Sequence, residues 1–290
     1  MSTNPGPIVS RRQLGAALRQ LRLDARKTIK DAAEDLQVHP AKISRLETAQ
    51  RNISVPDVLA LLNLYGVTDK STRERLMKLA RENKQPAWWD KFTLGPALEK
   101  FIGLEGSANK ISDFQLLIPG LLQIRRYTTA VLDAFPSRPD LPLAREDAIE
   151  LRAMRREKLS PETVLDVIID ETAVRRIVGG REVMRDQLEH LIRVSSSPDG
   201  VSLRLIPFAS GAHAGAMSGF TVLQFDSDSD GSSSGLTDVV YIEAISGGIY
   251  LERPEDVSEY LSAFSSLRER ALTAAKTIKF LQAIAEDLRP

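Results

Sequence analysis

The 290-residue chain is 42% hydrophobic and 27% charged with no formal net charge, a composition typical of a folded globular protein. It contains no cysteine, which excludes disulfides and thiolate metal sites and fits a reducing cytoplasm. No apolar run approaches the roughly 18 residues of a membrane span, and the N-terminus lacks the apolar core of a signal peptide. We therefore expect a cytoplasmic protein.

Charge is distributed unevenly along the chain. Residues 1–83 contain 15 Lys and Arg against 9 Asp and Glu, whereas the remainder contains 24 against 30. A basic part followed by an acidic part is typical of a nucleic-acid-binding module joined to a regulatory module. Chance segregation of surface charge gives the same pattern, so charge alone does not decide between them.

Residues 1–83 are predicted to form an all-α bundle of five helices. Apolar residues recur at helical spacing, and breaker or capping residues separate the periodic segments. A flexible arm is expected over residues 1–10. The predicted helices cover residues 11–25, two short segments between Thr28 and Gln50, residues 55–65 and residues 71–83.

The segment from Thr28 to Gln50 reads as two short helices joined by a tight turn. Thr28 is a suitable N-cap, and Pro40 suits the first turn of the second helix, where its missing N–H would have no partner. The small Ala33 allows the two helices to cross closely. A left-handed turn at Gln37 would cost up to about 1–2 kcal/mol relative to glycine.

These residues resemble the helix-turn-helix of bacterial regulators of the xenobiotic-response-element (XRE) type. The match consists of Ala33, Val38 and the string Ile43 to Glu47. The sequence departs from the family pattern at Gln37, where glycine is common, and at Ile29, where glutamine is common. The second departure removes a polar contact that relatives often make to DNA.

In a motif of this class the second helix lies in the major groove, with its N-terminal residues on base edges. Arg45 is the predicted base reader, because a guanidinium can bond O6 and N7 of guanine together. Ala41 could meet a thymine methyl group, and Lys42 could reach a base or a phosphate. A simple helix cap is the stronger alternative for His39, and each of the others taken singly could be a solvated surface residue. The predicted DNA-binding residues, with the phosphate contacts included, are Thr28, Lys30, His39, Ala41, Lys42, Ser44, Arg45, Arg51 and Asn52.

Residues 84–106 are predicted to link two domains, because the stretch is rich in proline and glycine. It contains the adjacent Trp88 and Trp89. Such aromatic residues more often fill a seam between domains, although they could also stack on a ligand.

Residues 107–290 are predicted to form a mixed α+β domain for regulation or dimerisation. Strands and helices alternate in no repeating order, which indicates an α+β fold. Predicted strands cover residues 111–117, 164–170, 201–207, 220–225, 239–243 and 249–251. Predicted helices cover residues 121–134, 143–159, 181–195 and most of 254–286.

Two segments of this domain could hold a ligand. The glycine-rich residues 211–219 contain His213, which could lie at the edge of a site for a ligand or a partner protein. Trp88 and Trp89 could do the same. A lone histidine in such a loop is more often exposed and without a role. Aspartates alternate in residues 226–235 as in a calcium loop, but the bidentate glutamate is missing. We expect no metal and no cofactor.

The same half resembles the C-terminal domain of a large set of actinobacterial XRE-type regulators, described as antitoxin-like or WhiJ-like. The resemblance rests on four ordered segments, Ile118–Thr128, Asp170–Leu191, Leu205–Phe225 and Val239–Glu243. It implies a transcription factor regulated through a protein contact, often with a small protein encoded nearby whose action it opposes. It identifies no small-molecule effector.

Catalytic motifs are incomplete in this sequence. There is no phosphate-binding loop and no HExxH zinc motif, and the three histidines lie far apart. Ser107–Lys110 fits S-x-x-K without its partner motifs. Ala244–Gly248 approximates a nucleophile elbow, but a strand is predicted to follow it where the elbow requires a helix. We expect that the protein is not an enzyme.

The expected function is sequence-specific regulation of transcription. A homodimer would bind a pseudo-palindromic double-stranded operator, with recognition helices about 34–36 Å apart. The regulator is expected to control its own gene and to respond to a small partner protein through its C-terminal domain. Two alternatives remain open: an antitoxin-like interaction protein that sequesters the partner, and a regulator that senses a small metabolite.

Overall fold

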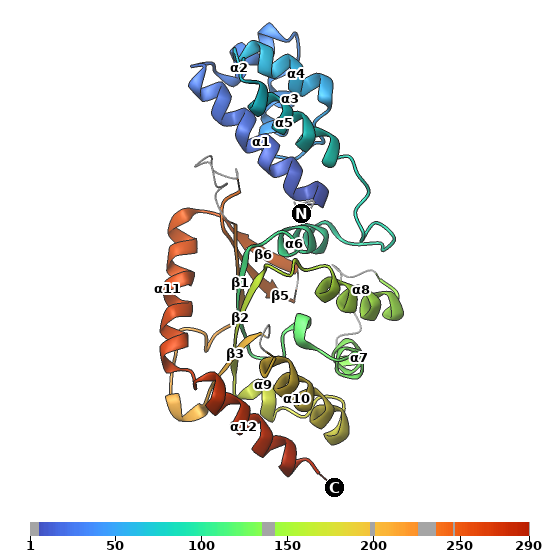
Figure 1. Cartoon of the computed structure of the whole chain (residues 1–290), viewed down its shortest axis with the longest axis vertical. Helices are drawn as coiled ribbons and strands as arrows, with labels where there is room; N and C mark the ends of the chain where they lie inside the picture. Colours follow the sequence, from blue (N-terminus) through green and yellow to red (C-terminus); the bar gives the residue numbers. More distant parts are fainter. Residues whose placement is uncertain (1–5, 135–142, 198–200, 226–235, 246, 290) are drawn as a thin grey trace. The chain divides into compact units, whose positions relative to one another are not determined.

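The computed structural model describes residues 6–134, 143–197, 201–225, 236–245 and 247–289 (Figure 1). The described residues form two compact units, and the chain passes from the first to the second after Asp90. Each unit is described by itself.

The first unit is a bundle of five helices, as predicted. Buried aliphatic side chains from all five form one core, which includes Leu14, Leu46, Leu62 and Leu76. Burying each such side chain contributes about 1.5–3 kcal/mol. The helices are α1 (Gly6–Asp24), α2 (Ile29–Asp35), α3 (Pro40–Glu47), α4 (Val55–Leu64) and α5 (Lys70–Glu82).

The prediction of a flexible arm is wrong for residues 6–10, which form the first turns of α1. Ile8, Val9 and Ser10 are buried there. Proline and glycine suggested an arm, but Pro7 fits the first turn of a helix, and burial of the following side chains stabilises the helix. Residues 1–5 lie outside the described part of the chain.

The second unit is built on a mixed sheet, and the α+β prediction is confirmed. Its described strands are ordered β3-β2-β1-β4-β5-β6. β1, β2 and β3 pair in parallel, whereas β4, β5 and β6 continue the sheet with antiparallel pairing. The strands are β1 (Lys110–Gln115), β2 (Val164–Asp170), β3 (Ser202–Ile206), β4 (Phe220–Gln224), β5 (Val239–Ala244) and β6 (Gly247–Leu251).

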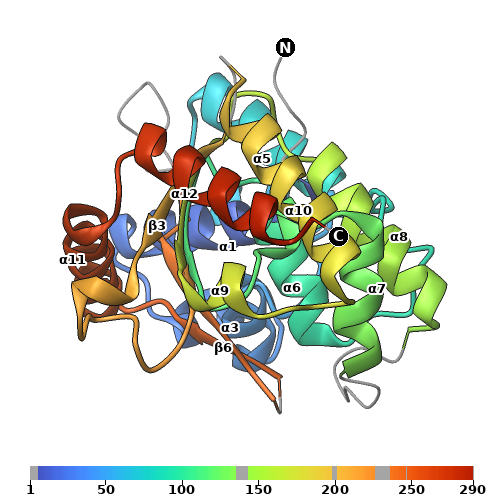
Figure 2. The ribbon, with the colours of Figure 1, turned by 90° about the horizontal axis from the view of Figure 1, so that it is seen from below.

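Helices cover both faces of this sheet. The long α11 lies on one face, and α6, α7, α8 and α10 lie on the other (Figures 1 and 2). Short 3-10 turns occupy Gly120–Leu122 and Phe208–Ser210. The helices are α6 (Pro96–Glu105), α7 (Arg125–Ala134), α8 (Arg145–Glu157), α9 (Thr172–Arg175), α10 (Arg181–Ser195), α11 (Pro254–Arg270) and α12 (Ala274–Asp287).

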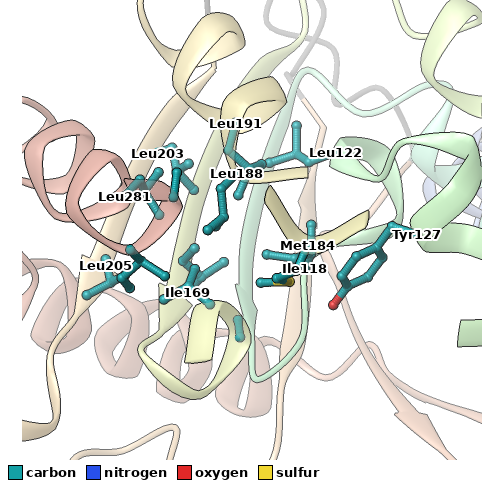
Figure 3. Packing of buried hydrophobic residues seen from close by; sticks show 14 of the residues in the cluster. Ile118, Leu122, Tyr127, Ile169, Met184, Leu188, Leu191, Leu203, Leu205 and Leu281 are labelled. Carbon is teal, nitrogen blue, oxygen red and sulfur yellow. The ribbon is translucent and has the colours of Figure 1, made fainter. Parts of the chain in front are cut away.

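Strand β2 lies between β1 and β3 and is buried on both faces, which explains why its sequence is apolar apart from Asp166 and Asp170. Val167 and Ile169 belong to one core and Ile168 to the other, because successive side chains of a strand point to opposite faces. In the first of these cores, Leu188 of α10 and Leu281 of α12 pack with Ile169 (Figure 3). This packing fixes α10 and α12 on the sheet.

The segment predicted as a linker contains a helix. Within residues 84–106, Pro96 occupies the first turn of α6 and Gly95 precedes it. The breaker residues thus begin a helix here. Phe101, Ile102 and Leu104 are buried, so the second half of the predicted linker belongs to the folded second unit.

Two sequence features fall wholly or partly outside the described residues: the acidic segment 226–235, and Ser246 of the elbow-like string. Within the described part of the chain, no group of three or more acidic, histidine or cysteine side chains could hold a metal ion. None of the described helices is long and apolar enough to cross a membrane.

Candidate nucleic-acid interface

The turn between α2 and α3 has the left-handed conformation expected at Gln37, with φ of 51°. The turn is closed by two backbone hydrogen bonds, from the Gln37 N–H to the Glu34 carbonyl (3.0 Å) and from the Val38 N–H to the Ala33 carbonyl (2.9 Å). Val38 packs against the bundle core, and Ala33 is fully buried. These contacts offset the strain of a non-glycine residue at this position.

Both helices begin at the predicted caps. The Thr28 hydroxyl accepts from the Asp31 N–H (3.1 Å), while the Asp31 carboxylate accepts from the Thr28 N–H (2.8 Å). This backbone hydrogen bond from Thr28 lowers the pKa of Asp31. His39 Nδ1 accepts from the Ala41 N–H (3.1 Å), so His39 caps α3, as its alternative interpretation proposed.

Helix α3, which is predicted to enter the major groove, is fixed by α1. Arg22 and Glu47 form two parallel hydrogen bonds of 2.7 and 2.8 Å, and their side chains are only 8% and 5% exposed. Arg22 also donates to the Lys27 carbonyl (2.9 Å). At Gly15, an added Cβ would lie 2.7 Å from the Leu46 carbonyl oxygen, so α1 meets the end of α3 in direct backbone contact.

The outer side of α3 presents the predicted base-contacting residues. Ile43 and Leu46 are buried, whereas Ala41, Lys42 and Ser44 are partly exposed. The Arg45 side chain is exposed and has no partner among the residues that the structure describes. Its guanidinium is therefore available to an external acceptor.

The predicted phosphate contacts divide into two groups. Thr28 and Lys30 lie at the exposed start of α2, where Lys30 forms a weak surface pair with Glu34 at 3.8 Å. Arg51 and Asn52 lie in the loop after α3, and both are exposed. The Asn52 side chain accepts from Arg11 Nη1 at 2.7 Å.

Three residues near this interface were not predicted to contribute. Arg11 of α1 donates to Asn52, and Asp57 of α4 pairs with Lys42. Lys84, which follows α5, lines a surface hollow together with these four residues. Each comes from a segment distant in sequence from α3, so helical spacing carries no signal for it. For Arg11 and Lys84, the only indication in the sequence was the basic character of α1 and of the segment after α5.

Two family models match the chain. A model described as a helix-turn-helix domain matches residues 13–76, and one described as Domain of unknown function (DUF5753) matches residues 98–283, which is more than half of the chain. The chain belongs to the DUF5753 family. No curated protein and no solved structure matches it. The helix-turn-helix match indicates a DNA-binding regulator, and the model for residues 98–283 describes a domain of unknown function.

The two tryptophans lie just ahead of the DUF5753 domain. Trp89 is 4% exposed and lies beside Gly6 of α1, while Trp88 is partly exposed and meets Trp89 edge to face at 5.5 Å. Burial leaves the Trp89 ring little surface for a ligand.

The side chain of His213 in the DUF5753 domain is only 7% exposed, contrary to the exposed position that is common for a lone histidine. Its Nε2 lies 3.2 Å from the carboxylate of Asp170, whose side chain is also buried. Its ring meets Phe114 edge to face. An added Cβ at Gly215 would lie 2.0 Å from the Phe114 ring, so the glycine-rich segment packs directly on the sheet.

A buried carboxyl group lies within the sheet of the DUF5753 domain. Asp113 is 6% exposed and accepts hydrogen bonds from Thr221 and Gln115, each at 2.8 Å. Burial raises the pKa of Asp113 to about 6. Nearby, Glu105 and Arg155 form a buried ion pair with two hydrogen bonds of 2.6 and 2.8 Å. The sequence signal for this site was Asp113, a charged residue inside the predicted strand 111–117.

Proposed function

We propose that the protein is a transcriptional regulator that binds a pseudo-palindromic operator as a homodimer. Residues of the helix-turn-helix read the DNA, and the DUF5753 domain dimerises and responds to a partner. In this proposal the protein acts in the cytoplasm, by binding and not by catalysis. The antitoxin-like resemblance supports a small protein encoded nearby as the partner.

The observation that carries the proposal is the state of α3. The helix is held rigidly by Arg22, Glu47 and the bundle core, while its outer side leaves Arg45 exposed and without a described partner. A rigid scaffold with an unpaired guanidinium suits bidentate recognition of guanine. Anchoring of this kind also lowers the entropic cost of binding.

The test is a fluorescence-anisotropy titration of the full chain on DNA from upstream of its own gene and on random duplex. Arg45→Ala is expected to lose about 1–3 kcal/mol on the specific site and little on random DNA, whereas Lys30→Ala weakens both alike. Equal losses of Arg45→Ala on both duplexes would remove its base-reading role. Binding of the wild type no tighter than to random DNA would refute autoregulation.

The partner is tested in the same titration with the product of the neighbouring gene added. A change in operator affinity supports partner control. A complex with the partner that leaves operator affinity unchanged favours the antitoxin-like interaction protein instead. Sedimentation of the free chain, with and without operator, tests the homodimer directly.

A further inference from the structure

A surface hollow of about 680 Å³ lies beside the recognition helix within the first unit. Four of its lining side chains are cationic and one is anionic, so their formal charge is +3. It is bordered by α1, α3, the loop after α3 and the start of α4. These charged residues are Arg11, Lys42, Arg51, Lys84 and Asp57.

The hollow is held together by contacts between distant segments. Asn83 is 3% exposed, and its amide donates to the Ile53 carbonyl (3.0 Å) and accepts from the Ile53 N–H (3.3 Å). These bonds join the end of α5 to the loop after α3, and so bring Lys84 beside Arg51. The cations therefore converge on a scaffold that is already formed.

Two of the cations are available and two are engaged. The side chains of Arg51 and Lys84 have no partner in the described part of the chain. Arg11 donates to Asn52 at 2.7 Å. Lys42 of the recognition helix pairs with the Asp57 carboxylate at 2.7 Å.

We propose that this hollow binds a phosphate group of the DNA backbone, and that Lys42 exchanges Asp57 for that phosphate. This inference rests on the proposed function. It adds that the Asp57 carboxylate competes with the DNA phosphate for Lys42. The excess positive charge attracts a phosphate, and the guanidinium groups can donate paired hydrogen bonds to its oxygen atoms. The hollow adjoins α3 through Lys42, so a phosphate bound there lies at the edge of the groove that α3 enters.

Asp57 occupies the position of the competing anion and is itself held in place. It accepts from the Ser54 N–H and hydroxyl at the start of α4, in a capping box. Lys42 and Asp57 are about one-third and one-quarter exposed, so solvent and an incoming phosphate can reach the pair. Asp57 therefore lowers the affinity of the hollow for any phosphate, so that tight DNA binding depends on contacts with the bases.

The experiment measures the affinity of the full chain for upstream and random duplexes over a range of salt concentrations. Lys84→Ala is expected to weaken both duplexes about three- to tenfold and to reduce the magnitude of the salt slope by about 0.9. The matched control is Lys70→Ala, because Lys70 of α5 is 89% exposed and lies outside the hollow. It should leave affinity nearly unchanged.

The exchange is tested with Asp57→Asn, which keeps the shape of the side chain. It is expected to tighten both duplexes about three- to tenfold. Glu74→Gln is the matched control, since it removes the same charge and frees Lys70 away from the hollow. The gain from Asp57→Asn should disappear in a Lys42→Ala background. Thermal unfolding of each variant verifies that the bundle is folded.

The outcomes separate this inference from the proposed function. If Lys84→Ala matches Lys70→Ala and Asp57→Asn matches Glu74→Gln, the hollow binds no backbone phosphate, although Arg45→Ala can still show base reading. If no variant or wild type binds DNA, both proposals fail. Pyrophosphate at constant ionic strength is the probe for a free phosphate. If it stabilises wild type but not Lys84→Ala, while DNA affinity is unaffected by Lys84→Ala, DNA as the source is overturned.

Discussion

Removing one partner of the Arg22–Glu47 pair should destabilise the helix-turn-helix severely. Arg22→Met leaves the Glu47 carboxylate, only 5% exposed, without its two short hydrogen bonds. Breaking a buried ion pair in this way costs about 3–5 kcal/mol. That is a large part of the roughly 5–15 kcal/mol by which domains are stable. The buried Tyr65 nearby, whose pKa burial raises to about 12, offers no compensating charge.

Replacing both partners should restore most of this stability. Arg22→Met combined with Glu47→Leu leaves no buried charge and similar volume, so the pair itself becomes nearly neutral. The remaining loss is the hydrogen bond from Arg22 to the Lys27 carbonyl, worth about 1 kcal/mol. The double variant should therefore be about 2–4 kcal/mol more stable than Arg22→Met alone, and a double-mutant cycle that includes Glu47→Leu isolates the coupling between the two side chains.

Urea unfolding followed by tryptophan fluorescence measures these changes. The only two tryptophans are Trp88 and Trp89, and Trp89 is buried beside α1, so the signal reports on the first unit. Arg19→Met, an exposed arginine of the same helix, is the control. A loss below about 1 kcal/mol for Arg22→Met, or a double variant no more stable than the single one, would refute the reasoning.

Two further predictions concern close packing and pH. Gly15→Ala should destabilise the first unit by about 1–2 kcal/mol, because the added methyl group would collide with the Leu46 and Glu47 carbonyls and this cost exceeds the gain in helix propensity. Urea unfolding measures the change, and an unchanged free energy of unfolding would contradict the prediction. Asp113→Asn should stabilise the chain by up to about 3 kcal/mol above pH 6 and by little below pH 4. The reason is that the pKa of Asp113 is raised in the folded state, so the stability of the wild type falls as pH rises from about 4 to 6. Thermal unfolding at several pH values tests this prediction, and an effect of the substitution that does not change with pH would contradict it.

Local features of the helix-turn-helix were readable from sequence. The Thr28 cap, Pro40 at the start of α3, the left-handed Gln37 and the buried Ile43 all appear as expected. Each depends on interactions within about four residues, such as a side chain bonding a nearby N–H or an apolar residue repeating at helical spacing.

The strand ranges of the second unit were also largely readable, and β2 spans the predicted residues 164–170. The sequence did not indicate which strands pair in parallel. That β1, β2 and β3 are parallel while β4 runs antiparallel beside β1 is a non-local choice. It follows from how the intervening helices pack on the two faces, which periodicity alone does not report.

The sequence by itself therefore determined the motif, the positions of its caps and the base-reading candidate Arg45. Tertiary structure decided which charges are available for DNA. Lys42 pairs with Asp57, and Arg11 donates to Asn52. Lys84 lies near the loop after α3 because its neighbour Asn83 is hydrogen-bonded to Ile53 of that loop. The contacts of Lys42 with Asp57, of Arg11 with Asn52 and of Asn83 with Ile53 join residues that are 15, 41 and 30 positions apart in the chain. Only packing of α1, α4 and α5 around α3 brings them together, because no local backbone preference acts over such separations.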